Sequence, residues 1–517
     1  MTMDHRPRRT RRGNPIVPAD PGTRSSRALT LLLTIIFAAL AIGWQNMPED
    51  VQRAAVLGPE PVPTIPTSDT RAPGSMFTEM YLRMYLKMNN ATAIRTELAK
   101  DPDGLEQLIN QVDAFAEGPA DRIRTVILEA EMVGPEQALD RIETLRFDLM
   151  GDREALQIDS SDDAVARYAA AQAVGYEFAI QELNSLQTVY TDGPDELDQS
   201  ARDQLAARYG VFGELTLSWG QSENTRAAML GQPWLFLGIA LGFTVLVIGS
   251  VLIGFGILVW GLTWIGNART RFYHPIPEPG GSVMLETYAW FVGAFFVYVV
   301  AATAIQFHLP EYALYTLPAQ WTLMLVPLWP LLRGMRSREW RHAMGLTRGQ
   351  GVFREIGAGF VAYLASLPLF LVGVGITLIV IVVQMLMQAS QAGAPPAVPP
   401  SNPIVDLIGS GDPTIIIFIV TLATIWAPIT EELIFRGALF RHLRSRIAWP
   451  IAAIISAVLF AYLHSYGPLM VAPLIALGFM FAFMREWRGS IIAPMTAHFL
   501  HNGTLMCLMI SMAYALS

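Results

Sequence analysis

Cysteine is nearly absent from this chain of 517 residues, which contains only Cys507. A single cysteine cannot form an intrachain disulfide bond, and it also excludes a zinc site built from several cysteines. The sequence has no His-Glu-x-x-His segment either, so no local pattern requires zinc. Charged residues make up 15% of the chain and hydrophobic residues 52%. This balance indicates a polytopic membrane protein that carries a water-soluble part.

The two signs of charge are segregated along the chain. Residues 46–229 contain 32 acidic and 15 basic residues, a net charge of −17, whereas the remainder has 12 acidic and 21 basic residues, a net charge of +9. The basic residues of the remainder stand in short segments that flank hydrophobic runs. That placement is a signal of membrane topology, and we therefore expect no nucleic-acid partner.

The N-terminal part predicts a tail, an anchor and a linker. Residues 1–27 carry seven arginines among Pro, Gly, Ser and Thr, which is typical of a basic cytoplasmic tail. Residues 28–45 are an apolar run that we interpret as a transmembrane anchor. A cleaved signal peptide is the alternative, because Ala39-Leu40-Ala41 has the small-x-small form of a cleavage site. Both interpretations place the adjoining segment outside the cytoplasm, beginning with a Pro-rich linker over 46–74.

Residues 75–228 predict an acidic, helical, water-soluble domain. The segment is rich in Ala, Leu, Glu, Arg and Gln, and turn signals interrupt it at Asp101-Pro102, Gly118-Pro119, Gly134-Pro135 and Gly193-Pro194. We expect stacked antiparallel helices between these breaks. The sequence does not specify a function for this domain, and a protein partner is our hypothesis for it.

From residue 231 onward the chain predicts membrane helices, first over 231–345 and then in a core over 349–517. The hydrophobic runs lie at 233–262, 285–307, 312–332, 353–388, 413–438, 450–466, 468–485 and 490–514. If the N-terminus is cytoplasmic, the arginines between the runs fall on the cytoplasmic side and residues 46–228 fall outside. The predicted fold is an all-α, polytopic transmembrane bundle with an inserted extracytoplasmic helical domain, in a prokaryotic plasma membrane.

Two adjacent glutamates interrupt the apolar sequence in the segment 427–436. A charge at the bilayer centre costs at least about 2.5–3.5 kcal/mol, so such residues are rarely incidental. On a helix, Glu432 and Arg436 lie on one face at i,i+4 with the acid first, which is the favourable order for an ion pair. Glu431 has no cation at that spacing. We therefore predict that Glu432 is paired and that Glu431 is available for chemistry.

Two further polar pairs occur within later hydrophobic runs. Phe460 and His464 are separated by three residues, and so are His498 and Asn502. At a rise of about 1.5 Å per residue, Glu431, His464, His498 and Asn502 all lie near the middle of a hydrocarbon layer about 30 Å thick. Three helices thus offer polar groups at a similar depth, as a buried site requires.

The three motifs Glu-Glu-x-x-x-Arg, Phe-x-x-x-His and His-x-x-x-Asn, in this order on separate hydrophobic segments, resemble the CPBP family of intramembrane proteases. That family includes type II CAAX prenyl endopeptidases and bacterial relatives linked to bacteriocin self-immunity. The resemblance covers residues 349–517.

The resemblance implies that Glu431 and His464 activate a water molecule and that His498 and Asn502 stabilise the oxyanion. The residues Glu432, Arg436 and Phe460 would support the site. The reaction would be hydrolysis of a peptide bond in a membrane-associated protein or lipidated peptide. His501, one turn from His498, is the competitor for its role, and the motif spacing favours His498.

Other functions use the same residues. Glu431, His464 and His498 could hold zinc, so the cofactor is either none or zinc. A non-catalytic membrane scaffold or immunity-type protein could retain the fold, and buried ionisable residues also mark transporters. The intact set of motifs favours the enzyme, because a scaffold has no need to keep all four polar residues together. Nothing in the sequence indicates whether the substrate is prenylated.

Overall fold

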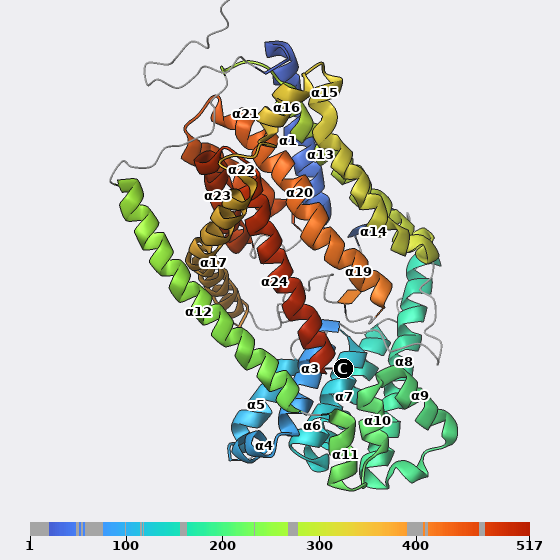
Figure 1. The fold of residues 1–517 in the computed structure, drawn as a ribbon. Coiled ribbons are helices and arrows are strands. Elements are labelled where there is room, and N and C mark those ends of the chain that lie inside the picture. Colours follow the sequence, from blue (N-terminus) through green and yellow to red (C-terminus); the bar gives the residue numbers. More distant parts are fainter. Residues whose placement is uncertain are drawn as a thin grey trace, which may run out of the picture. The chain divides into compact units, whose positions relative to one another are not determined.

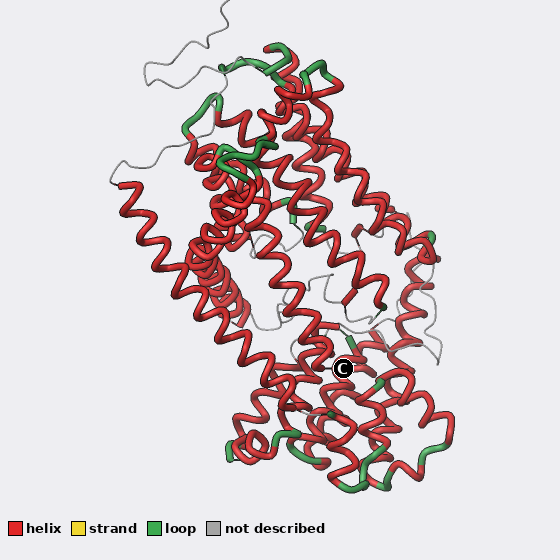
Figure 2. Tube along the Cα trace, viewed as in Figure 1, coloured by secondary structure: helices red, strands yellow, loops and turns green. Residues whose placement is uncertain are grey.

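The computed structural model describes residues 20–47, 51–52, 55–56, 76–98, 100–113, 116, 118–155, 163–231, 233–266, 278–389, 407–408, 412–464 and 471–516. Within these ranges all regular elements are helices, and no strand occurs (Figure 2). Residues 1–19 of the predicted tail and most of the predicted linker 46–74 lie outside the described residues.

The chain divides into two compact units. The first unit contains α1 (Arg24–Gln45), α13 to α16, α19 to α23, and most of α12, α17 and α24 (Figure 1). The second unit contains α3 to α11 together with the beginning of α12 and the end of α24.

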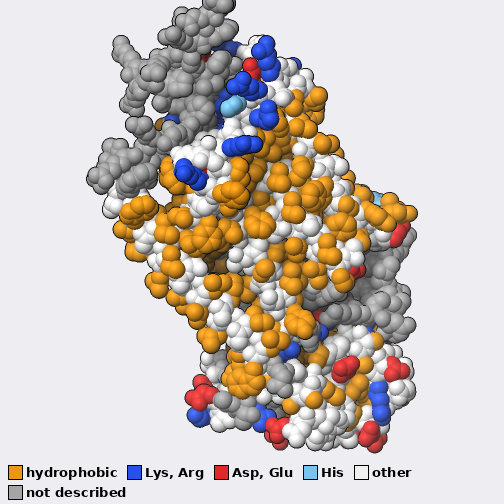
Figure 3. Space-filling view, viewed as in Figure 1, with side chains coloured by type: hydrophobic (Ala, Val, Ile, Leu, Met, Phe, Trp, Pro, Cys, Tyr) orange, Lys and Arg blue, Asp and Glu red, His pale blue; other side chains and the backbone are white. Residues whose placement is uncertain are grey.

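Six described helices are long and apolar enough to cross a membrane. They are Arg24–Gln45, Pro233–Thr263, Val283–His308, Val352–Gln384, Pro413–Arg444 and Ile492–Leu516. Large hydrophobic side chains are exposed along them, and Figure 3 shows a broad surface of this kind. In water such a surface would be unfavourable, whereas a bilayer solvates it. The prediction of an all-α, multi-pass membrane protein is confirmed.

The segment 312–332, which we predict to be a membrane span, is not one continuous α-helix. This segment consists of short pieces, namely η2 (Pro310–Tyr315), α14 (Thr316–Ala319), η3 (Gln320–Leu328) and α15 (Trp329–Leu332). η2 and η3 are 3₁₀ helices. Pro318, Pro327 and Pro330 recur every few residues, and none has the N–H that continues an α-helix. Hydrophobicity alone did not reveal these breaks.

Two other predicted spans form helices that fall short of the length or composition of the six. α22 (Trp449–Tyr462) has 14 residues. α23 (Val471–Arg488) has 18 residues, and its last turn carries Arg485, Glu486 and Arg488. The helix α22 packs closely on α23, because a Cβ added at Gly478 would stand 3.0 Å from Ala457 Cα. A larger residue at this position would push the two helices apart by a few tenths of an ångström.

Glycine also mediates the contact between α12 (Pro233–Gly266) and α17 (Val352–Ala389). A Cβ at Gly254 would lie 2.0 Å from the carbonyl oxygen of Leu364. In α17 that oxygen has no α-helical donor, because the residue four positions later is Pro368. The proline of one helix and the glycine of the other therefore bring the two backbones together.

The second unit is a bundle of helices with its own apolar core. Its helices are α3 (Met76–Asn89), α4 (Thr92–Leu98), α5 (Pro102–Asp113), α6 (Pro119–Met132), α7 (Pro135–Ala155), α8 (Asp163–Thr191), η1 (Pro194–Glu196), α9 (Gln199–Tyr209), α10 (Val211–Leu217) and α11 (Glu223–Leu230). Four of them begin at the prolines of the turn signals, since proline is well tolerated in the first helical turn. Leu82, Ile127, Leu145 and Leu186 are fully or almost fully buried at its centre.

Charged groups are buried beside this core and are paired. Arg124 Nη1 donates to Asp121 Oδ1 over 2.8 Å, and the Tyr209 hydroxyl donates to Glu182 Oε2 over 2.6 Å. Arg208 also pairs with Glu182. Burial raises the pKa of the Tyr209 phenol, so it remains a hydrogen-bond donor at neutral pH.

The last turn of α24 (Ile492–Leu516) is held in the second unit. Lys87 Nζ of α3 donates to the carbonyl oxygen of Ala515 over 2.7 Å. Phe236 packs against Ala515 and Leu516. A cation at the C-terminal end of a helix satisfies carbonyl groups that have no partner within the helix.

Candidate active site

The helix that carries the two glutamates is not α-helical throughout. Between Pro413 and Arg444 the elements are α19 (Pro413–Thr421), η4 (Leu422–Trp426), α20 (Ala427–Glu432), η5 (Leu433–Leu439) and α21 (Phe440–Arg444). Both η4 and η5 are π-helical. π-helical turns widen a helix locally and free main-chain groups, and they are frequent at functional sites. Here they lie on both sides of the turn that presents Glu431 and Glu432.

The first π segment explains the position of Asn502. Ala427 donates its N–H to the carbonyl oxygen of Leu422, five residues back. In the same register the Ala423 oxygen would accept from residue 428, but this residue is Pro428, which has no N–H. Asn502 Nδ2 of α24 donates to the Ala423 oxygen over 2.8 Å. One of the two amide hydrogens is thereby committed, and the other stays available for a ligand.

Glu432 is fully buried and contacts two partners. Its Oε1 accepts from Arg436 Nη1 over 2.9 Å and lies 3.0 Å from His498 Nδ1. Arg436 Nη2 donates to the carbonyl oxygen of Gly478 in α23 over 3.1 Å. The exposed fraction of both the Glu432 and the Arg436 side chain is 0%. The structure thus pairs these two residues one turn apart and connects them to α23 and α24.

Aromatic rings enclose the Arg436 guanidinium. Its Cζ lies 4.5 Å from the ring centroid of Phe460, 5.2 Å from that of Phe481 and 5.7 Å from that of Phe435. Phe481 also stacks on His498 with 5.2 Å between centroids, and Phe460 contacts His464 edge-on at 4.8 Å. Cation–π attraction is strongest where water is excluded, so these rings stabilise the buried cation. They also fix the planes of the two histidines.

Glu431 has a different environment from its neighbour. Its Oε2 is buried and has no hydrogen-bond donor among the described residues. Two imidazole nitrogens face it, with Nε2 of His498 at 3.9 Å and Nε2 of His464 at 4.0 Å. These distances are too long for direct hydrogen bonds and suit contact through a small bridging group.

The contacts of the Nδ1 atoms determine what the Nε2 atoms can do. His464 Nδ1 lies 2.8 Å from the carbonyl oxygen of Phe460, which can only accept, so Nδ1 carries the hydrogen. His498 Nδ1 faces Glu432 Oε1, a carboxylate oxygen that also accepts from Arg436. In the neutral form of each ring, Nε2 is then the basic nitrogen. Three acceptors therefore converge on one point, namely the carboxylate of Glu431 and the Nε2 atoms of His464 and His498.

The structure separates His501 from this cluster. Its ring contacts Tyr363 at 6.1 Å and Phe370 at 5.2 Å between centroids, and both partners belong to α17. His498 and His501 are three residues apart, and their side chains contact different helices. His498, which the motif spacing favoured, is the histidine that reaches the glutamates.

Several contributors to the site carried no signal in the sequence. The carbonyl oxygens of Ala423 and Gly478 and the ring of Phe481 are all contacts between separate helices. The run Trp426-Ala427-Pro428 contained one indication, since a proline inside a hydrophobic helix leaves a carbonyl free.

Comparison with known proteins agrees with this location. Residues 413–504 match the family described as type II CAAX prenyl endopeptidase Rce1-like. The chain is also 33% identical over 84 residues to the uncharacterized protein YpbD of Bacillus subtilis (strain 168), an alignment that covers 16% of this chain and 42% of YpbD. The matched part thus spans less than half of that relative. No solved structure matches the chain.

All seven motif residues from Glu431 to Asn502 lie inside the matched range. The matched range also contains η4, α20, η5, α22 and α23, which surround the three converging acceptors. The part of the chain that is similar to the type II CAAX prenyl endopeptidase Rce1-like family is therefore the part that builds this candidate site.

Proposed function

We propose that this protein is an intramembrane endopeptidase that hydrolyses a peptide bond of a membrane-associated protein or a lipidated peptide. The observation that carries the proposal is the convergence of Glu431 Oε2 with the Nε2 atoms of His464 and His498, at 4.0 and 3.9 Å. A water molecule about 2.8 Å from each atom fits these separations. It can donate its two hydrogens to Glu431 and His464, and it accepts from His498 when Nε2 carries a hydrogen. The match of residues 413–504 to the type II CAAX prenyl endopeptidase Rce1-like family supports the same reaction.

In the proposed reaction Glu431 is the general base. It takes a proton from the water, whose oxygen attacks the carbonyl carbon of the scissile bond and gives a tetrahedral oxyanion. Glu431 then delivers the proton to the leaving amide nitrogen, and the carbon–nitrogen bond breaks. His464 positions the water. Its Nε2 can accept a hydrogen bond from the second hydrogen of the water, which is not transferred to Glu431.

Asn502 and His498 are the proposed oxyanion donors. Asn502 has one amide hydrogen left after its contact with Ala423, and His498 can donate from Nε2 when this atom is protonated. His498 keeps its contact with Glu432 in that state, so the carboxylate stabilises the imidazolium. Donors held in place before the reaction stabilise developing charge without reorganisation.

Glu432 and Arg436 have a positioning role in this proposal. Their charges cancel within a fully buried pair, and Glu431 is the acid of the two that faces the proposed position of the water. Oε1 of Glu432 also holds the His498 ring in place through its contact with Nδ1.

A zinc-based alternative would use Glu431, His464 and His498 as ligands, with the ion activating the water. The Nδ1 contacts of both histidines resemble those of zinc-bound imidazoles. Tetrahedral ligands at about 2.0–2.1 Å from zinc lie roughly 3.3 Å from each other, which is closer than 3.9 and 4.0 Å. The spacing therefore favours water between these groups, and we propose a metal-independent mechanism.

The proposal is tested by comparing the membrane proteomes of cells that make the wild-type protein or Glu431→Gln. We expect peptides that are cut in the wild-type membranes to stay intact in the variant. The same number of cut peptides in both membranes would favour the scaffold or the transporter. Purified protein and a recovered substrate peptide then provide the direct cleavage measurement.

A further inference from the structure

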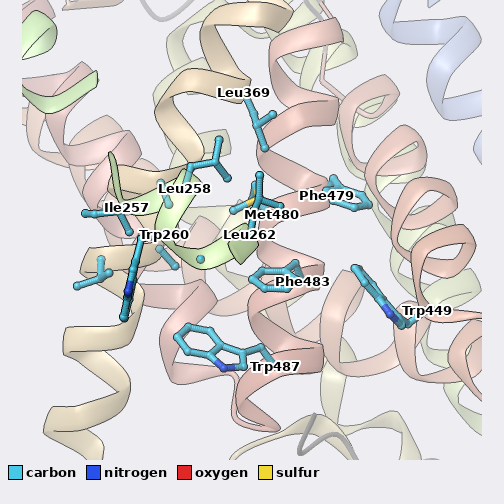
Figure 4. Close-up of a pocket in the computed structure, with 14 residues that line it drawn as sticks. Ile257, Leu258, Trp260, Leu262, Leu369, Trp449, Phe479, Met480, Phe483 and Trp487 are labelled. Carbon is cyan, nitrogen blue, oxygen red and sulfur yellow. The ribbon is translucent and has the colours of Figure 1, made fainter. Parts of the chain in front are cut away.

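A cavity of about 490 Å³ lies in the first unit, apart from the candidate active site. Fourteen residues of α12, α17, α22 and α23 line it, and all of them are apolar. Figure 4 shows Ile257, Leu258 and Trp260 of α12 across from Phe483 and Trp487 of α23. None of the motif residues lines the cavity.

Two of the walls are helices of membrane-spanning length. Each of the helices Pro233–Thr263 and Val352–Gln384 has a most hydrophobic stretch of 18 residues. Only 6% and 17% of these stretches, respectively, are buried inside the protein, so most of their surface faces the bilayer. Trp260, at the cavity wall, is 66% exposed. Water finds almost no hydrogen-bond partners in such a lining. Hydrocarbon is the material that the bilayer supplies at this depth.

One end of the cavity has the composition of a membrane interface. Trp449 is the first residue of α22, and Trp487 is the residue before the last of α23. The guanidinium of Arg488 lies 4.9 Å from the ring centroid of Trp487 and donates two hydrogen bonds to Glu355, over 2.9 and 2.8 Å. The exposed Arg354 stands next to Glu355 in the first turn of α17. Tryptophan and arginine together are typical of the level at which lipid headgroups lie.

We propose that this cavity binds one acyl chain of a bilayer phospholipid, with the phosphate of its headgroup at the end near Trp487 and Arg354. The apolar lining is complementary to a hydrocarbon chain. Only indole N–H groups provide polar contacts inside, so a polar ligand has no partners there.

The position of α23 gives the bound chain a consequence for catalysis, and this step rests on the proposed function. Phe479, Met480 and Phe483 face the cavity. The opposite side of α23 bears Gly478, which accepts from Arg436, and Phe481, which stacks on His498. A lipid in the cavity therefore packs against one face of α23, and the opposite face of α23 holds His498 and the buried ion pair in position.

A matched pair of glycines on α12 makes the proposal testable. A Cβ built on Gly261 or on Gly256 meets nothing within 4 Å, so both positions accept a larger side chain. Gly261 lines the cavity and Gly256 does not. Gly261→Trp fills the cavity, and Gly256→Trp is the control for a tryptophan on the same helix.

The measurement is native mass spectrometry of the intact protein, released from detergent after growth in a membrane of known phospholipid composition. We expect wild type and Gly256→Trp to retain one phospholipid, and Gly261→Trp to retain at least tenfold less. Equal retention by all three proteins would overturn the proposal, whether or not they cleave substrate. Loss of cleavage by Gly261→Trp with its lipid retained would also contradict it.

A second measurement needs no variant. The wild-type protein is reconstituted in phosphatidylglycerol vesicles that contain a tracer with a photoreactive diazirine on its acyl chain. We expect peptides 257–262 and 479–487 to be labelled at least fivefold more than the outward-facing segment 245–253 of α12. Labelling of the cavity peptides that is no stronger than that of segment 245–253 overturns the assignment to a bilayer phospholipid.

Discussion

Glu431 and Glu432 are adjacent in the sequence, but their contacts differ. Glu432 is fully buried against Arg436 and His498, whereas Glu431 is 14% exposed and faces two basic nitrogens. Glu432 is therefore committed to its hydrogen bond with Arg436. Oε2 of Glu431 has no hydrogen-bond donor among the described residues and faces the proposed position of the water molecule.

This difference predicts opposite effects of two conservative substitutions. Glu432→Gln and Arg436→Ala each leave a buried charge without its partner, which costs about 3–5 kcal/mol. Both variants should therefore show lower expression and lower melting temperature, with activity reduced as a consequence. Glu431→Gln leaves no cation unpaired, so it should fold at least as well as wild type and lose proteolysis almost completely.

Melting curves in detergent and single-turnover cleavage on the same three variants measure this prediction. The roles of the two glutamates are reversed if Glu431→Gln cleaves normally while Glu432→Gln is folded and inactive.

Removal of metal separates the two mechanisms that share Glu431, His464 and His498. We expect purified protein to keep its activity after exhaustive treatment with a strong zinc chelator, because the three acceptor atoms are spaced for water. Zinc content should be measured by mass spectrometry before and after treatment. Activity that disappears with the metal and returns with one equivalent of zinc would assign these residues as ligands.

At the scale of helices, the sequence predicts features that depend on neighbouring residues better than it predicts contacts between helices. The starts of α5, α6, α7 and η1 fall at the predicted prolines, since proline acts on its own neighbours. The i,i+4 relation of Glu432 and Arg436 is equally local. The contact of Arg436 with Gly478 joins residues 42 positions apart and depends on how η5 and α23 pack.

The π segments mark another limit of sequence reasoning. A hydrophobic pattern does not distinguish an α turn from a π turn, because both keep the same side chains in the membrane. The anchoring of Asn502 depends on this difference, since Ala423 and Pro428 leave a carbonyl free only in the π register. The motif thus predicted that Asn502 belongs to the site, but it did not predict the partner that holds it.

A double-mutant cycle distinguishes the anchoring role of Asn502 from its role as an oxyanion donor. Pro428→Ala restores an N–H that can donate to the Ala423 oxygen. In this background Asn502→Ala should destabilise the protein less than it does alone, by about 0.5–1.5 kcal/mol for one hydrogen bond. The loss of kcat should be the same in both backgrounds if Asn502 also donates to the oxyanion.

Unfolding in detergent and cleavage at saturating substrate give the two readouts of this cycle. A purely structural Asn502 would regain both stability and kcat when residue 428 is alanine, and this result would remove Asn502 from the proposed mechanism.

At the scale of the whole molecule, contacts within the first unit gather the predicted cytoplasmic flanks. Arg441 pairs with Asp20 over 2.9 Å, before the start of α1. Ser26 and Ser282, at the starts of α1 and α13, lie 2.7 Å apart. Arg444, at the end of α21, pairs with Glu486 near the end of α23 over 2.9 Å. These helix ends therefore share one side of the first unit, whichever side of the membrane it faces.

The positive-inside rule predicts that this side is cytoplasmic, because most of the arginines between the membrane segments stand there. If α1 and α12 each cross the bilayer once, we expect residues 75–228 to be extracytoplasmic. An alkaline phosphatase fused at residue 150 should therefore be active, and one fused at residue 345 inactive. Green fluorescent protein at the same positions should give the reverse pattern, which controls for expression. Phosphatase activity at 345 together with fluorescence at 150 would place the acidic domain in the cytoplasm, and any protein partner of that domain would then be cytoplasmic as well.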